Sequence, residues 1–324
     1  MKAKILEELK QNNGYVSGQA LCEKLNVSRT AIWKAINHLR EEGYVIDSLP
    51  NKGYRIVSYP DILSENEIKS AIGTSLIKNV IYFAGTDSTN NRAKLFGEEG
   101  KQDGTLVVAD YQTKGKGRRG RSFESPGGKS IYMTLLLRPD ISPVKASMIT
   151  IVAAMAVRMG IEEACGVKSF IKWPNDIVAE GKKLCGILTE MSAEPEHINY
   201  VVTGIGINVN NDSMPKEIEN VSVSVKMLTG KEYKRSVIIA SVMKWFDVYY
   251  REFLQYGNLK GIRDEYNRNL IHMEKEVEIL KGNSSYKARS LGIDENGQLI
   301  TERDGQREAV ISGEVSVRGV YGYV

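Results

Sequence analysis

The sequence of 324 residues predicts a multidomain α+β fold, with an N-terminal winged helix-turn-helix, a central mixed α/β domain and a small C-terminal β-barrel. Three stretches of different texture lead to this prediction. Residues 1–62 read as short helices followed by two short strands, residues 82–270 mix helical and strand-like runs, and residues 271–324 are β-like throughout. Residues 63–81 are expected to form a linker with a short helix. A chain of this length can bury two or three separate cores.

The composition is that of an ordinary globular protein, with 42% hydrophobic and 26% charged residues. The net charge of +4 is mild and does not by itself indicate a nucleic-acid partner. Charges run through the first eight residues, so a signal peptide is not expected. The longest apolar stretch, residues 148–159, is shorter than a membrane span and contains Thr150 and Arg158. We therefore expect a cytoplasmic protein with no membrane partner.

The cysteines exclude two classes of site. Cys22, Cys165 and Cys185 are far apart, odd in number and lack C-x-x-C spacing. Disulfides and a zinc ribbon are not expected, and a reducing cytoplasm fits this usage. The three histidines are equally scattered, so we expect no metal site held by the protein.

The N-terminal pattern predicts a helix-turn-helix. Ser17 is placed to cap one helix, and Ser28 caps a second helix that follows a three-residue turn. In the second helix Ile32, Ile36 and Leu39 form the buried stripe. The opposite side carries Arg29, Thr30, Trp33, Lys34 and Asn37, where a DNA groove would meet them.

Two short strands, residues 43–47 and 53–57, then form a wing whose turn carries Lys52. Residues 1–60 hold nine Lys or Arg against six Asp or Glu, a weak basic bias that a solvated helical interaction domain would share. The order of helix, helix-turn-helix and wing is what favours DNA binding. The predicted DNA-binding residues are Ser28, Arg29, Thr30, Trp33, Lys34, Asn37 and Lys52.

The central region alternates between two periodicities. Helices are predicted over residues 89–97, 147–165 and 236–256, and strands over 106–110, 131–137, 169–172, 185–191 and 200–208. The middle helix is apolar almost all round, so it should be buried against a sheet. Beyond it, strands are predicted over 276–280, 286–293, 299–302 and 307–311, with hairpin signals at Gly282-Asn283, Asn296-Gly297 and Asp304-Gly305.

A glycine-rich basic loop is the most distinctive local feature. Residues 114–121 contain five cations, and Gly115, Gly117 and Gly120 let the backbone bend close to a ligand. The loop also matches G-x-G-x-x-G, with Asp140 twenty residues after the last glycine. A dinucleotide site requires a helix after the glycines, and a β-type run follows instead. The loop therefore indicates a polyanionic ligand of another kind.

Further polar motifs each allow a structural explanation when taken alone. Residues 87–90, Asp-Ser-Thr-Asn, are either helix caps or ligand donors. Residues 172–176, Lys-Trp-Pro-Asn-Asp, end a strand with a cation and a carboxylate, and Lys183 opens the next strand. Gly204 and Gly206 in a strand allow a close neighbour, either another chain or a flat ring.

Together, and in this order, these motifs resemble the catalytic domain of the biotin–protein ligases. With the helix-turn-helix in front and a small SH3-like β-barrel behind, the chain resembles the bacterial family of bifunctional biotin ligases and biotin-operon repressors over nearly its whole length. Lys116 stands where this family commonly has arginine, and Phe123 where it commonly has tryptophan. The first change keeps the charge but loses bidentate geometry, and the second keeps an aromatic cover.

The resemblance implies a two-step reaction. Biotin's carboxylate attacks the α-phosphate of ATP to give biotinyl-5′-AMP and pyrophosphate, and biotin then passes to a lysine of a biotin carboxyl-carrier protein or a similar acceptor domain. The implied catalytic residues are Lys183, Asp176 and Arg118. The implied biotin-binding residues are Ser88, Thr89, Asn90, Gln112, Lys116, Gly117, Arg118 and Lys183. The implied adenylate- or ATP-binding residues are Gly115, Arg119, Arg121, Lys172, Asn175 and Asn208.

The resemblance also implies partners. Mg²⁺ is expected on the phosphates rather than in a protein cage. The adenylate is expected to order the glycine loop and to favour a homodimer, through sheet edges of the central domain, that binds operator DNA. Three alternatives remain open: a non-catalytic ligand-sensing transcription regulator, a lipoate-type acyl ligase, and a nucleic-acid-binding protein that uses the basic loop.

Overall fold

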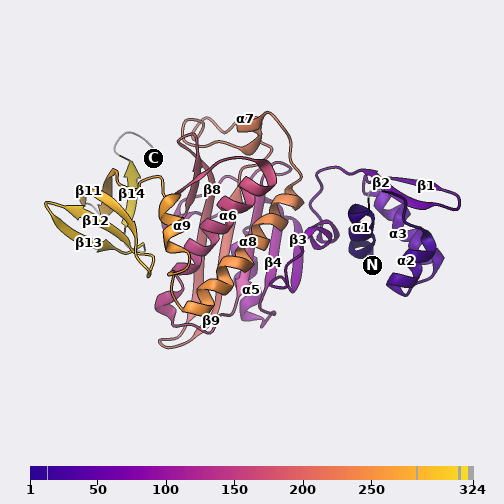
Figure 1. The fold of residues 1–324 in the computed structure, drawn as a ribbon, viewed down its shortest axis with the longest axis horizontal. Helices are drawn as coiled ribbons and strands as arrows, with labels where there is room; N and C mark the ends of the chain where they lie inside the picture. The colour runs from indigo at the N-terminus through magenta and orange to yellow at the C-terminus, as the bar shows by residue number, and fades with distance from the viewer. Residues whose placement is uncertain (13, 282–283, 313–314, 320–324) are drawn as a thin grey trace.

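The computed structural model describes residues 1–12, 14–281, 284–312 and 315–319. The N-terminal domain and the C-terminal sheet lie at opposite ends of a larger central domain (Figure 1). In the N-terminal domain the helices are α1 (Lys2–Gln11), α2 (Gly18–Leu25) and α3 (Arg29–Glu41), and the strands are β1 (Val45–Leu49) and β2 (Gly53–Ser58). The strands pair antiparallel as the predicted wing.

The predicted helix caps and buried stripe are confirmed. The Ser17 hydroxyl accepts a hydrogen bond from the Ala20 amide at 3.0 Å, and the Ser28 hydroxyl accepts one from Ala31 at 3.2 Å. Each bond satisfies an amide that the helix leaves unpaired in its first turn. The small core of this domain includes the predicted stripe on α3 and three residues of α1: Ile5, Leu6, Leu9, Ile32, Ile36 and Leu39.

The central domain is built on a seven-stranded mixed sheet in the order β3-β4-β5-β9-β8-β7-β6. Its strands are β3 (Asn79–Thr86), β4 (Thr105–Gln112), β5 (Ile131–Leu137), β6 (Phe170–Lys172), β7 (Asp176–Ala179), β8 (Lys182–Ala193) and β9 (Ile198–Ile207). The helices before and around the sheet are α4 (Glu65–Ala71), α5 (Thr89–Glu98), α6 (Met148–Cys165), α7 (Val225–Thr229), α8 (Arg235–Tyr256) and α9 (Arg263–Arg268).

Helices cover both faces of this sheet. α6 and α8 pack together over one face and share its main core, whereas Ala93 of α5 packs with Val107 and Leu136 in a separate small cluster. We expected the apolar stretch in α6 to be too short for a membrane, but residues 143–165 are long and apolar enough to cross one. Since 72% of that window is buried inside the protein, the helix serves as a core element here.

The C-terminal domain is a five-stranded antiparallel sheet in the order β13-β12-β11-β10-β14. Its strands are β10 (Glu276–Lys281), β11 (Ser284–Ile293), β12 (Leu299–Arg303), β13 (Gln306–Val310) and β14 (Val315–Gly319). Two predicted hairpin turns are confirmed, and the third, at residues 282–283, lies outside the described residues. Among the described strands, no ladder joins β13 to β14.

Several elements were not predicted. β3, β7, β14, α7 and α9 are absent from the sequence-based assignment. β3 begins at Asn79, three residues before the expected start of the central domain. The short helix expected in the linker is α4. The domain boundaries themselves stay predictions.

A buried carboxylate joins the N-terminal domain to the central one. Glu67 of α4 is 1% exposed and accepts hydrogen bonds from Lys10 Nζ at 2.6 Å, Tyr44 Oη at 2.6 Å and Ser236 Oγ at 2.9 Å. These donors come from α1, from the residue before β1, and from α8. One side chain of the linker therefore ties both domains together.

Candidate active site

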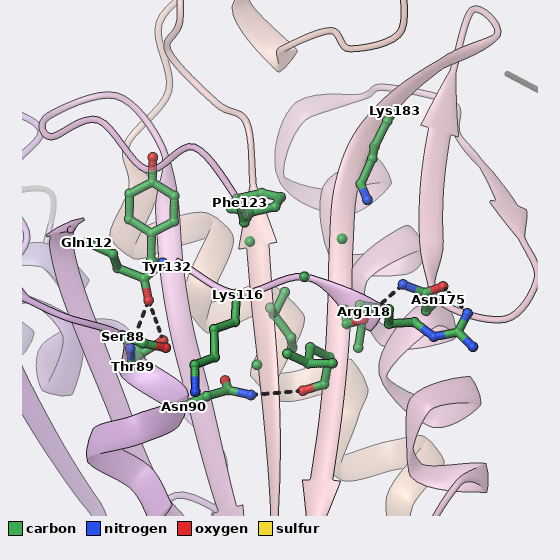
Figure 2. Close-up of a pocket in the computed structure, with 17 residues that line it drawn as sticks. Ser88, Thr89, Asn90, Gln112, Lys116, Arg118, Phe123, Tyr132, Asn175 and Lys183 are labelled. Atoms are coloured by element: carbon green, nitrogen blue, oxygen red, sulfur yellow. Dashed lines mark hydrogen bonds between the residues drawn. The ribbon is translucent and has the colours of Figure 1, made fainter. Parts of the chain in front are cut away.

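Most of the predicted site residues line one cavity and an adjoining hollow on the central domain. The cavity is lined by Ser88, Thr89, Asn90, Gln112, Lys116, Gly117, Arg118, Asn175 and Lys183, together with Phe123 and Tyr132 (Figure 2). The hollow shares Arg118, Asn175 and Lys183 with it and adds Arg119, Arg121, Lys172 and Asp176. Segments from residue 88 to residue 206 thus converge on one region of the sheet.

Phe123 covers the glycines of the sheet. A Cβ atom added at Gly206 would lie 2.7 Å from the Phe123 ring, and one added at Gly186 would lie 3.4 Å from it. Of the two glycines predicted to have a close neighbour, Gly206 has the protein's own Phe123 ring and Gly204 has the Asn90 side chain. The cavity volume is only about 50 Å³, against about 430 Å³ for the hollow.

Neutral hydrogen-bonding groups line one end of the cavity. The side-chain oxygen of Gln112 accepts from Thr89 N at 2.8 Å and lies 3.1 Å from Thr89 Oγ1. The side-chain nitrogen of Gln112 donates to Ser125 Oγ at 2.9 Å, which fixes the amide's orientation. Burial raises the pKa of the nearby Tyr132 hydroxyl to about 12, so that group stays protonated. This end suits a polar, uncharged part of a ligand.

Asn90 lies in the same network, and both ends of its side-chain amide are hydrogen-bonded to protein atoms. Its Nδ2 donates to Leu188 O at 3.2 Å and to Glu190 Oε2 at 2.8 Å, while its Oδ1 lies 2.7 Å from Thr134 Oγ1. Sequence reasoning missed Thr134 and Glu190. The available signal for Thr134 was a lone polar residue in the apolar run of residues 131–137.

The glycine loop aims two cations at the cavity. Arg118 is half-buried, and its guanidinium donates to Asn175 Oδ1 at 3.0 Å and to the Ser312 carbonyl of the C-terminal domain. Burial lowers the pKa of Arg118 from its ordinary value, since the opposing effect of Asp176 is smaller. Lys116 donates to Asn91 Oδ1 at 2.7 Å. No α-helix follows the glycines, and the chain leads into β5, which removes the dinucleotide interpretation.

Residues 172–176 and Lys183 form the opposite wall. Lys183 Nζ lies 2.8 Å from Asp176 Oδ1, and both side chains are largely buried. Asn175 donates to Ile187 O at 3.0 Å, which fixes the amide that receives Arg118. The Trp173 indole donates to Gly297 O at 3.0 Å, so the C-terminal sheet contacts this motif directly.

Three residues with positive charge therefore line one cavity, namely Lys116, Arg118 and Lys183, and the Arg118 guanidinium is directed toward Asn175 (Figure 2). Two anions held about 4 Å apart repel by roughly 4 kcal/mol at an effective dielectric of about 20. Cations at this position offset such a repulsion. Among the described residues no group of three or more His, Cys, Asp or Glu is arranged to hold a metal ion.

Two predicted residues are placed elsewhere. Gly115 does not line the cavity, and its carbonyl accepts from the Phe123 amide at 2.9 Å. Asn208 follows β9, and its side chain donates to Val223 O at 3.2 Å. Both shape the surroundings of the site rather than its wall.

Most of the predicted DNA-binding residues lie on the surface of the N-terminal domain. Arg29, Thr30, Trp33 and Lys34 of α3 are exposed, as is Lys52 in the wing. Trp33 is 55% exposed, which is unusual for so large an apolar side chain. Asn37 is half-buried, and its Oδ1 accepts from Arg40 at 3.3 Å.

Comparison with known proteins follows the same division of the chain. Residues 2–55 match the HTH domain, residues 82–208 match the Biotin/lipoate A/B protein ligase family, and residues 272–318 match the Biotin protein ligase C terminal domain. The Bifunctional ligase/repressor BirA of Bacillus subtilis (strain 168) is 37% identical over 94% of this chain and 94% of its own. The chain belongs to the bifunctional ligase/repressor family.

Other proteins support this membership. The ligase/repressor family member of Escherichia coli (strain K12) is 29% identical over 95% of this chain and 94% of its own length. A structure of biotin protein ligase from Aquifex aeolicus in complex with biotin and ATP is similar with a TM-score of 0.67 and 29% identity. That similarity covers 75% of this chain and all of the Aquifex chain. The resemblance inferred from the sequence motifs is confirmed.

Proposed function

We propose that this chain attaches biotin to a lysine of an acceptor protein through biotinyl-5′-AMP, and that the adenylate-bound form represses biotin-operon transcription. The observation that carries the proposal is a cavity with a neutral hydrogen-bonding end, at Thr89 and Gln112, and a cationic end. This arrangement matches a ligand with a polar uncharged head and a carboxylate tail. The adjoining hollow has room for the nucleotide.

In the first step a carboxylate oxygen of biotin bonds to the α-phosphorus of ATP, and the bond from that phosphorus to the bridging oxygen breaks. Pyrophosphate leaves with the electron pair. Lys183 and Arg118 lie where they offset the charge of the two reacting anions. Mg²⁺ bound to the phosphates would neutralise the leaving pyrophosphate, and the protein needs no metal cage for this.

In the second step the amine of the acceptor lysine bonds to the carbonyl carbon of biotin, and AMP leaves. The amine has an ordinary pKa of about 10.4, so it must lose a proton to react. Asp176 lines the hollow beside Lys183 and is the carboxylate proposed to orient the amine and accept that proton. Lys172, Asn175, Arg119 and Arg121 line the same hollow and are proposed to contact the nucleotide.

The repressor activity is assigned to the N-terminal domain. The face built by Arg29, Trp33 and Lys34 is proposed to enter the operator's major groove, with Lys52 beside it. We propose that adenylate binding orders the glycine loop and favours a homodimer that reads two half-sites. Sedimentation with and without biotinyl-5′-AMP tests this, and an unchanged monomer with the ligand bound would contradict it. We also propose a cytoplasmic location, because the three cysteines are free and this usage fits a reducing compartment.

The enzyme is tested by incubating the chain with biotin, Mg-ATP and a biotin-acceptor domain, and then weighing the acceptor. A gain of one biotin is expected. No gain with well-folded protein would favour a non-catalytic ligand-sensing regulator. Replacing biotin with lipoate in a parallel reaction tests the lipoate-type ligase, which predicts labelling by lipoate instead.

A further inference from the structure

Glu190 of β8 is a half-buried carboxylate beside the neutral end of the cavity. It accepts from Asn90 Nδ2 at 2.8 Å and from Lys94 Nζ at 2.7 Å. Burial alone would raise the pKa of Glu190, but the hydrogen bonds from Lys94 and Asn90 outweigh burial and hold its pKa below the ordinary value. Glu190 is therefore ionised at neutral pH and can only accept hydrogen bonds.

This carboxylate, together with the Leu188 carbonyl, fixes which way the Asn90 amide points. Both neighbours of Asn90 Nδ2, the Glu190 carboxylate and the Leu188 carbonyl, are acceptors only. The NH₂ group must therefore face them, and the amide oxygen must face Thr134. Space for the Asn90 side chain exists because residue 204 is glycine: a Cβ there would lie 2.0 Å from Asn90 Oδ1.

The orientation of the Asn90 amide in turn decides which neighbour receives the hydrogen of the Thr134 hydroxyl. Thr134 is fully buried, and its hydroxyl oxygen lies 2.7 Å from Asn90 Oδ1 and 2.8 Å from Thr89 Oγ1. A hydroxyl has one hydrogen to donate. With an oxygen of Asn90 facing it, Thr134 donates to Asn90 and gives no hydrogen to Thr89.

The consequence reaches the wall of the cavity. Thr89 must then donate its own hydrogen to Thr134 Oγ1, 2.8 Å away, because two hydroxyl oxygens at that distance need a hydrogen between them. Toward the cavity Thr89 therefore offers only oxygen lone pairs, which can accept from a ligand. If the Asn90 amide were reversed, its NH₂ would face Thr134, and the Thr134 hydrogen would turn to Thr89. Thr89 would then accept from Thr134 and turn its own hydrogen toward Gln112 and the cavity, so that it would meet a ligand N–H as a donor.

We propose that Glu190 is a positioning residue that, through Asn90 and Thr134, keeps Thr89 as a hydrogen-bond acceptor for an N–H of the ligand's polar head. This inference rests on the proposed function, since the cyclic urea of biotin supplies such N–H groups. Asn90 acts in this arrangement as a relay. Glu190 contacts neither the ligand nor the reacting atoms.

The test compares apparent KM values for biotin and for ATP, measured by pyrophosphate release with the full chain. Glu190→Ala removes the acceptor, and we expect its KM for biotin to rise about tenfold, the effect of one buried hydrogen bond. Its KM for ATP should stay within about twofold. Glu190→Gln keeps an oxygen that accepts from Asn90 and should restore most of the biotin affinity. Glu196→Ala is the matched control, because it removes an exposed carboxylate from the turn that follows the same strand.

Three results would contradict the proposal. An unchanged KM for biotin in Glu190→Ala, an equal rise for both substrates, or no rescue by Glu190→Gln would overturn the proposal. Thr134→Val gives an independent decision if Glu190→Ala does not fold: it too must raise the KM for biotin selectively. Combined with Glu190→Ala, it should add little, because both changes break one relay. If the wild-type chain labels no acceptor, the proposed function fails instead.

Discussion

Arg118 is the residue that connects the most parts of the site. It bonds Asn175 on the opposite wall and the Ser312 carbonyl of the C-terminal domain while its loop carries the glycines. A planar guanidinium can hold two such partners at once, whereas an ammonium group on a flexible stem holds them less rigidly. We infer that Arg118 keeps the loop closed over the adenylate.

Replacing Arg118 with glycine should therefore impair retention of the adenylate more than its formation. Loss of charge-assisted hydrogen bonds predicts a dissociation rate of biotinyl-5′-AMP about ten- to a hundredfold faster. Stopped-flow displacement of the adenylate measures this rate. Lys114→Ala removes an exposed cation of the same loop that does not line the cavity and should leave the rate unchanged. A wild-type rate in Arg118→Gly would contradict the assigned role.

His272 makes a different prediction, about stability and pH. It is 2% exposed, and its pKa is lowered to about 4 by burial first, and then by Lys172 and Lys275. An unfolded histidine titrates near 6.5, so the unfolded state takes up the proton first as the pH falls. The stabilising contribution of the neutral imidazole is complete above about pH 6.5 and is lost as the pH falls toward 4.

Over that range the free energy of unfolding should fall by about 3 kcal/mol on account of this one residue. Urea unfolding of the wild type and of His272→Gln at pH 7, 6 and 5 isolates the effect, since the other titrating groups are common to both. The wild type should lose more stability than the variant. Parallel pH curves would show that His272 does not titrate as described.

At the scale of elements, α3 presents its charged side to solvent and its apolar side to the core. Replacing both Arg29 and Lys34 with alanine should abolish operator binding and leave adenylate formation nearly intact. Gel-shift and pyrophosphate-release assays on the same protein test this.

Lys4→Ala removes an exposed cation from α1 and is the control for non-specific charge effects. It should bind the operator almost as the wild type does. Loss of adenylation in the double variant would mean that the N-terminal domain supports the active site. In that case the separation of the two activities would be wrong.

Elements with strong local signals could be predicted from the sequence. The caps at Ser17 and Ser28 and the nearly all-apolar α6 belong to this class, because a few neighbouring residues decide them. β7 could not, since its four residues gain their pairing from β6 and β8 on either side. Local pattern carries no information about such long-range neighbours.

The site divides in the same way. Ser88, Thr89 and Arg118 stand in short motifs that identify them, and the structure places them on one cavity. Glu190 belongs to no motif, and its role depends on a bond to Asn90, one hundred positions earlier in the chain. The position of Phe123 likewise could not be predicted, because it follows from packing of its ring on the glycines of β8 and β9.

At the scale of the whole molecule, Glu67 is the joint between the DNA-binding and central domains. Its removal would leave Lys10, which is 16% exposed, without its carboxylate, and Tyr44 and Ser236 without an acceptor. Breaking a buried ion pair on one side costs about 3–5 kcal/mol. Glu67→Ala should therefore destabilise the chain by about that amount and loosen the N-terminal domain.

Thermal unfolding and limited proteolysis measure the two effects, with faster cleavage expected near residues 59–75. Glu65→Ala is the matched control on the same helix, because Glu65 makes only an exposed pair with Lys69. It should change stability by less than about 0.5 kcal/mol. Equal behaviour of the two variants would show that Glu67 does not join the domains.

The bond between Arg118 and Ser312 spans 194 positions of the chain, and this has a consequence for protein synthesis. A ribosome releases the N-terminal domain, whose core is built within the first sixty residues, long before Ser312 exists. Each nascent chain therefore carries a folded DNA-binding domain for most of its translation while its loop lacks this contact. Repressor surface is made early, and an enzyme that can hold its intermediate is completed only as synthesis ends.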